Sequence, residues 1–560
     1  MLRPLAETAG RVRWAPGAHK LLHHVLMGIE ARAGNIERAR MHAEAVLGDG
    51  GESAAAKSML LNALALQGNQ ADANRRLTKL LDPLPRRPAA RIRLLYQAAK
   101  IASEAGDAEA ARCWAGAVLA LAPEHLQSLK LLHTIHVKHL PSDELRDKVS
   151  AWLQSGGEAA ELVAPAAMRI AFHDDQDWRA VIAHAERLPP YDIEATTHRI
   201  LALARLGEFA AAQAALARAH ALAPRGQDTA LRRDELDLVE ANVALLVGNP
   251  EEQVACINRV MDRYALAPIA LRQGAAPPLA PARLVSNAAD VADLGPRVAV
   301  IVTTYGRDDE AGLRSAVGSI LAQSYRNLEL ILVDDCSPDD TLPLLHSFAR
   351  ADPRVRVYQT PVNGGTYRAK NLGITKTDSP LIAFMDSDDW SHPQRIERQV
   401  QSLTDHQDAV AVVHNSLRIE PDGWIEFRQH ASRFAYISTM LRRVVIEQLG
   451  YFDAVRVSGD AEMIARIRSF YGDDAVRHEP LPTVLMARRD GSLTGGGAHY
   501  IGWRSVTGDR WRYHRAFKQW HRRCVAHGSL PYVAVAPAER PFPAPESVVR
   551  KREASAPEST

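Results

Sequence analysis

At 560 residues the chain is several times longer than a typical domain of about 100–200 residues, so it holds several domains and is not a small disulfide-stapled scaffold. Its 46% hydrophobic and 24% charged residues are typical of a globular protein and exclude a disordered or fibrous one. The 68 Lys and Arg residues balance 66 Asp and Glu, and this net charge of +2 carries no signature of nucleic-acid binding.

Cysteine content and hydropathy indicate the compartment. The four cysteines are too few and too widely spaced for a disulfide framework or a zinc site. The N-terminus lacks a signal-peptide pattern, and no uncharged apolar run of about 18 residues occurs. The sequence therefore predicts a cytoplasmic protein without a transmembrane segment, either free or peripheral at the inner membrane.

The first half of the chain is rich in alanine. Residues 1–290 hold 64 Ala, whereas residues 291–560 hold 27. Alanine is the best helix former, and here it lies among Leu, Val and Ile at helical spacings. We therefore expect an all-α domain over residues 1–267.

This helical half is repetitive. A small turn residue followed five positions later by Ala recurs in steps of 34, 38, 69 and 32 residues: Gly34/Ala39, Gly68/Ala73, Gly106/Ala111, Asp175/Ala180 and Gly207/Ala212. The pattern resembles the tetratricopeptide repeat (TPR) family, in which stacked helix pairs bury their apolar faces against one another. Such a solenoid either supports the rest of the chain or binds a protein partner on its concave surface.

Composition also predicts the other boundaries. A Pro- and Ala-rich stretch at 268–295 predicts a linker. A second folded domain is expected over 296–530. Residues 531–560 are rich in Pro, Ala, Ser and Glu, which predicts a disordered tail.

The second domain alternates short β-branched runs with amphipathic helical stretches. The runs cover residues 298–303, 328–333, 355–359 and 381–385. Continuous apolar runs of this kind are typical of parallel strands that helices cover on both faces. The pattern predicts an open α/β sheet whose ligands lie beyond the carboxyl ends of the strands.

Polar residues follow each predicted strand, in the motifs VIVTTYGRD, ILVDDCSPDD, NGGTYRAKNLGI and FMDSDDW. A single Asp pair would be weak evidence for a binding site, because Asp is a common turn former. Four polar strand ends on one edge of the sheet, however, predict a binding site there. The order and spacing of these motifs resemble glycosyltransferase family 2 over residues 297–500. The resemblance implies an α/β GT-A domain, a Rossmann-like nucleotide-diphospho-sugar transferase fold, preceded by the all-α TPR-like solenoid.

A transferase of this kind must stabilise the negative charge of a departing diphosphate. A divalent cation held by carboxylates does so as a Lewis acid, and Mn²⁺ or Mg²⁺ prefers oxygen ligands. By resemblance Asp388 is the direct metal ligand and Asp386 assists it, while Asp389 is the weaker candidate and could instead cap the following helix.

The resemblance also assigns a site for a nucleotide-diphosphate sugar, with UDP-sugars first among the donors. Asp335 matches the position that reads the base, and Asp334 supports it. Gly364 lets the backbone approach the ligand. Thr303 and Tyr305 match positions that line the nucleotide pocket. Arg368 and Lys370 either bind a phosphate or are ordinary charges on the surface of a helix.

The acceptor hydroxyl needs a base to take its proton. Asp460 matches the family position for this base, while Gly459 stands where the family usually has Glu. Glu462 is the second candidate, and helix capping alone is the alternative role for Asp460. A single base implies one displacement, which inverts the anomeric centre.

The sequence around Gln519 does not complete the Gln-x-x-Arg-Trp element of processive members, so one or a few sugars would be added. The aromatic and basic stretch at 503–523 could cover the donor diphosphate or hold the acceptor. We therefore expect a metal-dependent, inverting and non-processive glycosyltransferase that acts on a saccharide or glycoconjugate in bacterial surface polysaccharide biosynthesis. Two alternatives are a TPR scaffold with a degenerate transferase domain, against which the intact aspartates weigh, and a transferase whose protein acceptor binds the helical array.

Overall fold

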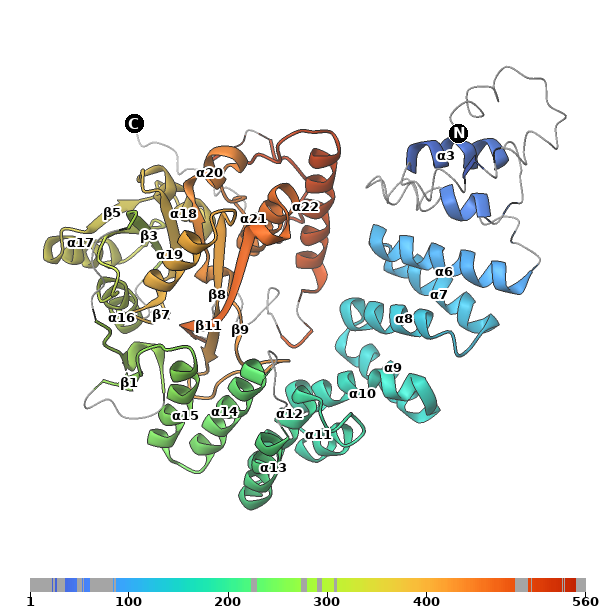
Figure 1. The fold of residues 1–560 in the computed structure, drawn as a ribbon, viewed down its shortest axis with the longest axis horizontal. Coiled ribbons are helices and arrows are strands. Elements are labelled where there is room, and N and C mark those ends of the chain that lie inside the picture. Colours follow the sequence, from blue (N-terminus) through green and yellow to red (C-terminus); the bar gives the residue numbers. More distant parts are fainter. Residues whose placement is uncertain are drawn as a thin grey trace. The chain divides into compact units, whose positions relative to one another are not determined.

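The computed structural model (Figure 1) describes residues 36–47, 55–60, 87–222, 229–272, 279–289, 295–306, 310–488 and, except for single positions, 502–549, with a few positions before residue 85. The chain divides into two compact units, Met1–Val163 and Ala164–Thr560. The division falls inside the helical half, and not within the stretch at 268–295 that was predicted to be a linker.

The first unit is helical throughout its described residues. Its helices are α3 (Ile36–Leu47), α6 (Pro88–Ala105), α7 (Ala108–Leu121), α8 (Leu126–His139) and α9 (Ser142–Ser155), followed by the start of α10 (Gly157–Arg169). The predicted turn at Gly106 is present: Gly106 has a φ of 80° and ends α6, and Ala111 of the next helix is fully buried. Gly34, Gly68 and Ala73 lie outside the described residues.

The second unit begins with the rest of the helical array. After a π-helix (Ile170–Asp175) come α11 (Trp178–Ala185), α12 (Ile193–Arg205), α13 (Phe209–Ala221), α14 (Thr229–Leu246) and α15 (Pro250–Arg263). Gly207 adopts the left-handed conformation that the turn pattern predicts, and Ala212 is fully buried. The all-helical prediction is confirmed for the described residues, while the assignment to the TPR family remains a prediction.

The described part of the Pro- and Ala-rich stretch is folded. Strand β1 (Ala270–Leu271) pairs with β2 (Leu284–Val285), and a 3₁₀ turn (Pro281–Arg283) leads into β2. Leu279 and Leu284 are buried in the same hydrophobic cluster as α12 to α15. This stretch therefore packs against its neighbours over its described residues.

A mixed sheet forms the centre of the second unit. Four parallel strands lie in the order β5-β4-β3-β6: β5 (Val355–Gln359), β4 (Leu328–Asp334), β3 (Val298–Thr304) and β6 (Leu381–Asp386). They match the four predicted strands to within one residue. The sheet continues with β10 (Met440–Arg442), β8 (Ala411–Ile419), β11 (Val476–Ala487) and β7 (Trp390–Ser391), and the short β9 (Arg433–Phe434) pairs with β8.

Helices cover both faces of this sheet, as the apolar runs predict. One face packs against α18 (Thr366–Thr375), α20 (Arg443–Leu449), α21 (Gly459–Tyr471) and α22 (Gly508–Ala526), and the other against α16 (Glu310–Leu321), α17 (Thr341–Ala351) and α19 (Arg395–Asp405). Successive side chains of β3 alternate between the two cores, with Ile301 in the first and Val300 in the second. Among the described residues, no helix combines the length and the apolar character that a membrane crossing needs.

Helices α14 and α15 hold residues 420–432, a segment that follows β8, by its backbone. The Asn242 amide donates to the Ile425 carbonyl at 2.9 Å and accepts from its N–H at 2.8 Å, and Gln253 donates to the Gly423 carbonyl at 2.8 Å. The Glu235 carboxylate accepts from the N–H groups of Ala431 and Ser432 at 2.8 and 3.1 Å. These buried polar side chains satisfy backbone groups that would otherwise be unpaired, so the end of the array is part of the second unit.

The C-terminal residues up to 549 are packed, and the predicted disorder from residue 531 is wrong for them. Val533 is buried and exchanges backbone hydrogen bonds with Leu449 and Tyr451. Phe542 and Val548 are buried in the core beneath α20 to α22. Pro and Ala content indicated disorder, but the apolar residues between them supply enough buried surface to hold the segment. Residues 550–560 lie outside the described part.

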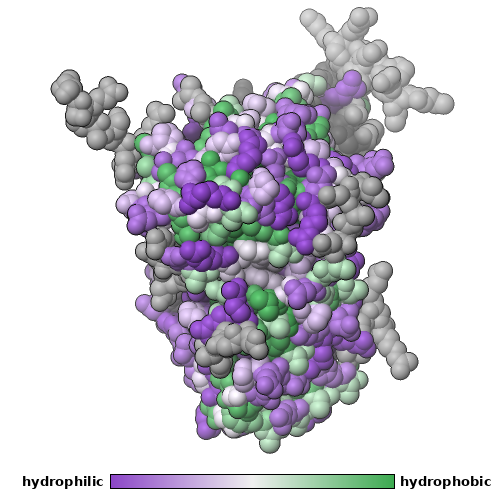
Figure 2. Space-filling view, turned by 90° about the vertical axis from the view of Figure 1, so that its left-hand side faces the viewer, coloured by the Kyte–Doolittle hydropathy of each residue, from purple (hydrophilic) through white to green (hydrophobic). Residues whose placement is uncertain are grey.

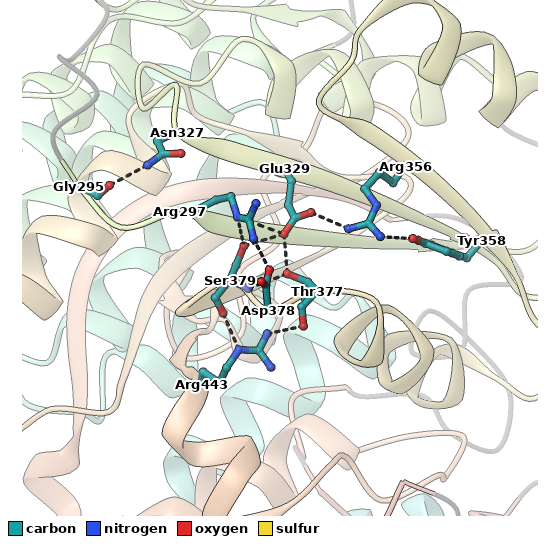
Figure 3. A network of polar contacts seen from close by, with 10 residues as sticks. All are labelled: Gly295, Arg297, Asn327, Glu329, Arg356, Tyr358, Thr377, Asp378, Ser379 and Arg443. Carbon is teal, nitrogen blue, oxygen red and sulfur yellow. Dashed lines mark hydrogen bonds and ion pairs between the residues drawn. The ribbon is translucent and has the colours of Figure 1, made fainter.

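Glu329 is the centre of a polar network at the amino end of the parallel strands (Figure 3). It accepts hydrogen bonds from Thr377 at 2.5 Å, Ser379 at 2.7 Å and Arg356 at 3.0 Å. Arg443 donates to the backbone carbonyls of Ser379 and Thr377. Burial alone would raise the pKa of Glu329, but these donors outweigh it and lower the pKa. The network joins β4 and β5 to the turn before β6.

Strand β5 forms the edge of the sheet, on the side that faces the viewer in Figure 2. Hydrophilic and apolar residues are interspersed over this face. The strand itself carries Arg356 and Tyr358, which contact each other. A charged side chain on an edge strand opposes pairing with another chain.

Candidate active site

The parallel register brings the predicted residues to one edge of the sheet. Thr303 of β3 is opposite Asp386 of β6, and Thr304 is opposite Asp334 of β4. Because these positions lie at the carboxyl ends of their strands, the loops that follow meet above the same edge. The convergence predicted from the sequence is therefore present.

Three aspartates lie at the end of β6 and directly after it. Asp386 and Asp388 are partly exposed, whereas Asp389 is only 2% exposed. One Asp389 oxygen, Oδ1, accepts a hydrogen bond from the Ala487 N–H at 3.2 Å, and Oδ2 has no hydrogen-bond partner among the described residues. Burial first, and then the Asp388 and Asp386 carboxylates, raise the pKa of Asp389 well above its ordinary value.

This donor set fits a divalent cation. It offers hard carboxylate oxygens that crowd one another, including a buried oxygen without a partner. A cation would satisfy that oxygen and offset the repulsion, and Mg²⁺ and Mn²⁺ prefer such ligands. Asp389 does not cap the following helix, because α19 begins at Arg395 with Gln394 at its N-cap.

Two cationic candidates on α18 have different environments. The Lys370 side chain is buried, and its Nζ lies 3.2 Å from Asp386 Oδ1 and 5.5 Å from the centre of the Tyr367 ring. Lys370 is thus a group of the site and not a surface charge. Arg368 packs over Gly364, where a Cβ atom would come within 2.6 Å of the Arg368 Cδ. Gly364 is therefore needed for the close approach of this side chain.

The glycine turn before α18 is held by Asp335. Its Oδ1 accepts from the Gly364 N–H at 2.9 Å and from the Thr360 hydroxyl at 2.8 Å, and its Oδ2 accepts from the Gly365 N–H at 2.6 Å. Gly365 has a φ of 88°, a conformation that favours glycine. Asp335 therefore shapes the loop above the strands, and its role toward a nucleotide base stays a prediction.

The other candidates for the nucleotide pocket lie on the same loops. Asp334 is fully buried and accepts hydrogen bonds from Ser337 and Gln359. The Thr303 hydroxyl lies 2.8 Å from the hydroxyl of Thr366. Tyr305 is 56% exposed. Asp334 and Thr303 therefore tie neighbouring loops together, while Tyr305 is open to a ligand.

Asp460, the predicted base, lies in the first turn of α21. It is the second residue of this helix, and Ser458 is at the N-cap with a φ of 67°. Its carboxylate accepts from the Ala461 N–H at 2.7 Å and is hydrogen-bonded to the phenol of Tyr367. Tyr367 also interacts electrostatically with Asp386, so it links the candidate base to the carboxylates at the end of β6.

Glu462, the second candidate base, is not part of this site. It is fully buried and lies 2.7 Å from Arg466 and 2.8 Å from His521 of α22. Burial alone would raise the pKa of Glu462, but Arg466 and His521 outweigh it and lower the pKa. Glu462 therefore joins α21 to α22 in a buried ion-pair network, and the prediction of a catalytic role is wrong.

Sequence reasoning missed three residues that the fold brings to the site: Tyr367, Arg418 and Arg510. Arg510 is 8% exposed; its Nε donates to the Ser458 hydroxyl at 3.0 Å, and it interacts electrostatically with Tyr367, Asp460 and Arg418. Arg418, near the end of β8, also interacts with Asp389. The basic stretch at 503–523 was a signal for Arg510, whereas Arg418 had none.

The chain is similar to known glycosyltransferases. Residues 299–460 match the family model "Glycosyl transferase family 2". An uncharacterized glycosyltransferase of Haemophilus influenzae is 35% identical over 108 residues, which cover 19% of this chain and 42% of that protein. The succinoglycan biosynthesis protein ExoO of Rhizobium meliloti is 30% identical over 228 residues, covering 36% of this chain and 64% of that protein. The crystal structure of S. aureus TarS 1–349 in complex with UDP-GlcNAc is similar with a TM-score of 0.30 and 18% identity over 35% of this chain and 60% of that chain.

The chain spans less than two thirds of the length of either curated relative. The family match, however, begins in β3 and ends at Asp460. It therefore includes the strand ends with Asp335, Asp386 and Asp388 as well as the start of α21. Residues 299–460 form a domain of glycosyltransferase family 2, which confirms the family predicted from the sequence.

Proposed function

We propose that this protein is an inverting, metal-dependent and non-processive glycosyltransferase of bacterial surface polysaccharide or glycoconjugate biosynthesis. It moves a sugar from a nucleotide-diphosphate donor, with UDP-sugars first among the candidates, to a hydroxyl group of a saccharide or glycoconjugate. The observation that carries the proposal is the placement of the carboxylates: Asp386 at the end of β6 and Asp460 of α21 both interact with the same buried tyrosine, Tyr367, and Asp389 interacts with Asp386 and Asp388. The assignment of ExoO to succinoglycan biosynthesis supports the pathway class.

Asp388 and Asp386 would hold the cation, and the unpartnered Oδ2 of Asp389 supports their arrangement around it. Bound there, Mn²⁺ or Mg²⁺ would supply Lewis-acid stabilisation of the diphosphate leaving group.

Asp460 acts as the general base. Its carboxylate takes the proton of the acceptor hydroxyl as that oxygen forms a bond to the anomeric carbon and the bond from this carbon to the diphosphate oxygen breaks. One displacement inverts the anomeric centre, and no second carboxylate nucleophile is required.

Two buried cations complete the electrostatics. Lys370 lies beside Asp386, and Arg510 lies next to Asp460. Positive charges fixed in a partly buried site stabilise negative charge that develops on a leaving group, because little reorganisation is needed. We therefore assign Lys370 to the diphosphate side of the donor and Arg510 to the side of the base.

The test is a panel of UDP-, GDP-, CMP- and dTDP-sugars with Mn²⁺, in which donor hydrolysis and transfer to saccharide acceptors are measured separately. We expect turnover with one nucleotide class and a fall in transfer of at least about 10²-fold in Asp460→Asn. Asp408→Asn, at an exposed position after α19, is the matched control and should keep full activity. The absence of turnover with every donor would refute the proposed function.

A further inference from the structure

Tyr367 and Gly459 form a complementary pair beside the proposed base, although they are far apart in the sequence. A Cβ atom built on Gly459 would lie 2.9–3.0 Å from three atoms of the Tyr367 ring. Real Cβ contacts are essentially never this short, so any other residue at 459 would displace the ring or the helix start. The tyrosine ring thus fills the space that the glycine leaves open.

The ring has little freedom to move away. Tyr367 is 5% exposed, and its ring lies 5.6 Å from that of Phe452, which in turn contacts Phe384 of β6. The backbone of Phe452 is held by Asn371, whose amide donates to the Phe452 carbonyl at 2.9 Å and accepts from its N–H at 3.0 Å. Helix α18 therefore fixes both the tyrosine and the aromatic residue behind it.

The phenol at the end of this ring reaches Asp460. It is hydrogen-bonded to the carboxylate, and Tyr367 also interacts electrostatically with Asp386. On the other side of the helix start, Arg510 donates to the Ser458 hydroxyl. Ser458 adopts a left-handed backbone conformation, so the turn into α21 is held from α22 while the tyrosine holds the carboxylate from α18.

We infer that Tyr367 is a positioning residue that orients Asp460 toward the acceptor, and that Gly459 is glycine so that this tyrosine can approach. The inference rests on the proposed function of Asp460 as base. It does not require Tyr367 to exchange a proton with the substrate.

The first test is Tyr367→Phe, which keeps the ring and removes the hydroxyl. We expect kcat for sugar transfer to fall about 10-fold, because a hydrogen bond to a charged group is lost, while the donor KM stays within about twofold. Tyr513→Phe is the matched control: Tyr513 is also buried and donates to a carboxylate, Asp453, at 2.8 Å. It should lower the midpoint of thermal unfolding without lowering kcat. Unchanged kcat in Tyr367→Phe, or equal kcat losses in both variants, would overturn the inference.

The second test is a double-mutant cycle of Gly459→Ala and Tyr367→Ala, measured both by kcat and by thermal unfolding. Gly459→Ala should reduce kcat about 10-fold or more beside the native tyrosine, but less than about twofold in the Tyr367→Ala background, where the clash is gone. Equal losses in the two backgrounds contradict the pairing. If the wild type transfers no sugar at all, the proposed function fails and this role with it, whereas an active enzyme that tolerates Tyr367→Phe overturns this role alone.

Discussion

Two carboxylate clusters lie at opposite ends of the same parallel strands and have opposite properties. At the amino end, Glu329 accepts three hydrogen bonds and its pKa is lowered. At the carboxyl end, Asp389 accepts one backbone hydrogen bond, has a bare oxygen among the described residues, and its pKa is raised. The sheet holds both carboxylates in place, but hydrogen-bond donors outweigh burial only at Glu329, whereas at Asp389 burial and like charges outweigh the attraction of Arg418.

The opposite pKa shifts of Glu329 and Asp389 distinguish a carboxylate that stabilises the fold from one that is suited to binding a ligand. A carboxylate surrounded by donors, such as Glu329, stabilises the fold by linking elements. Carboxylates that repel one another, such as Asp389 beside Asp386 and Asp388, destabilise it, and a bound cation would offset this cost. The carboxyl end of the sheet is therefore the end prepared for a ligand.

Of the substitutions that test this comparison, Asp388→Ala should have the largest effect on the rate of sugar transfer. Loss of a metal ligand removes several kcal/mol of leaving-group stabilisation, so the rate of sugar transfer should fall about 10³-fold or more. The unfolding free energy without metal should stay the same or rise, because a like charge beside Asp389 is removed. Steady-state kinetics and urea unfolding measure the two quantities. A variant that is active or strongly destabilised would break the contrast.

The reciprocal change is Glu329→Gln. The substitution replaces the carboxylate that pairs with Arg356 by a neutral amide. Because Arg356 then loses its ion-pair partner, the unfolding free energy should fall by about 2–4 kcal/mol. The donor KM and kcat of the remaining folded protein should not change, since Glu329 lies at the other end of the strands. Urea unfolding followed by circular dichroism measures the loss. A specific fall in kcat at full stability would be evidence against a purely structural role.

Metal binding itself provides the third comparison. At a Mn²⁺ concentration of 100 times Kd, binding to the native state should raise the unfolding free energy by about 2.7 kcal/mol. Asp389→Asn should weaken this gain, whereas Glu329→Gln should keep it. Thermal unfolding with and without Mn²⁺, with an EDTA control, is the measurement. An equal gain in all three proteins would show that the cation binds elsewhere.

Glu235 tests an intermediate case, a fully buried carboxylate with only two neutral donors. Burial raises its pKa from 4.5 to about 8, although the N–H groups of Ala431 and Ser432 oppose the shift. Between these pH values the native state keeps a proton that the unfolded chain releases. The unfolding free energy should therefore fall as pH rises from about 4.5 to 8 and level off above that range.

Glu235→Gln should remove this part of the pH dependence. The difference in unfolding free energy between the variant and the wild type should therefore change by at least about 1 kcal/mol between pH 5 and pH 8. Urea unfolding at pH 5 and pH 8 measures it, and Glu329→Gln is the control with the opposite shift. Parallel pH curves for the wild type and Glu235→Gln would mean that the backbone donors keep Glu235 ionised.

The sequence predicts the strands and their polar carboxyl ends well, because both depend on local pattern. Continuous apolar runs define β3 to β6, and polar residues such as Asp386 and Asp388 follow directly. The choice of Asp460 as the candidate base came from the resemblance of its motif to the family, and it remains a prediction. Local pattern could not reveal contacts between residues that are distant in the chain. Glu462 pairs with His521 in the interior, and the Tyr367 ring packs against Gly459.

Domain organisation was harder to predict for the same reason. Asn242 and Gln253 read as ordinary polar positions on helices, but each binds the backbone of the transferase half. Likewise, composition predicted a disordered tail where Val533 and Phe542 are buried. A polar residue on a helix indicates solvent only if no other chain segment lies against it, and the sequence alone does not carry that information.

The hold of α14 and α15 on residues 420–432 limits how this protein can be taken apart or recombined. A chimera that exchanged all helices before the sheet would leave the backbone of Ile425 and Ala431 without the side chains that now satisfy it. The helices of the first compact unit that precede α10 are therefore the ones to exchange in such a chimera. Helices α14 and α15 must be kept together with the sheet, whatever the preceding helices bind.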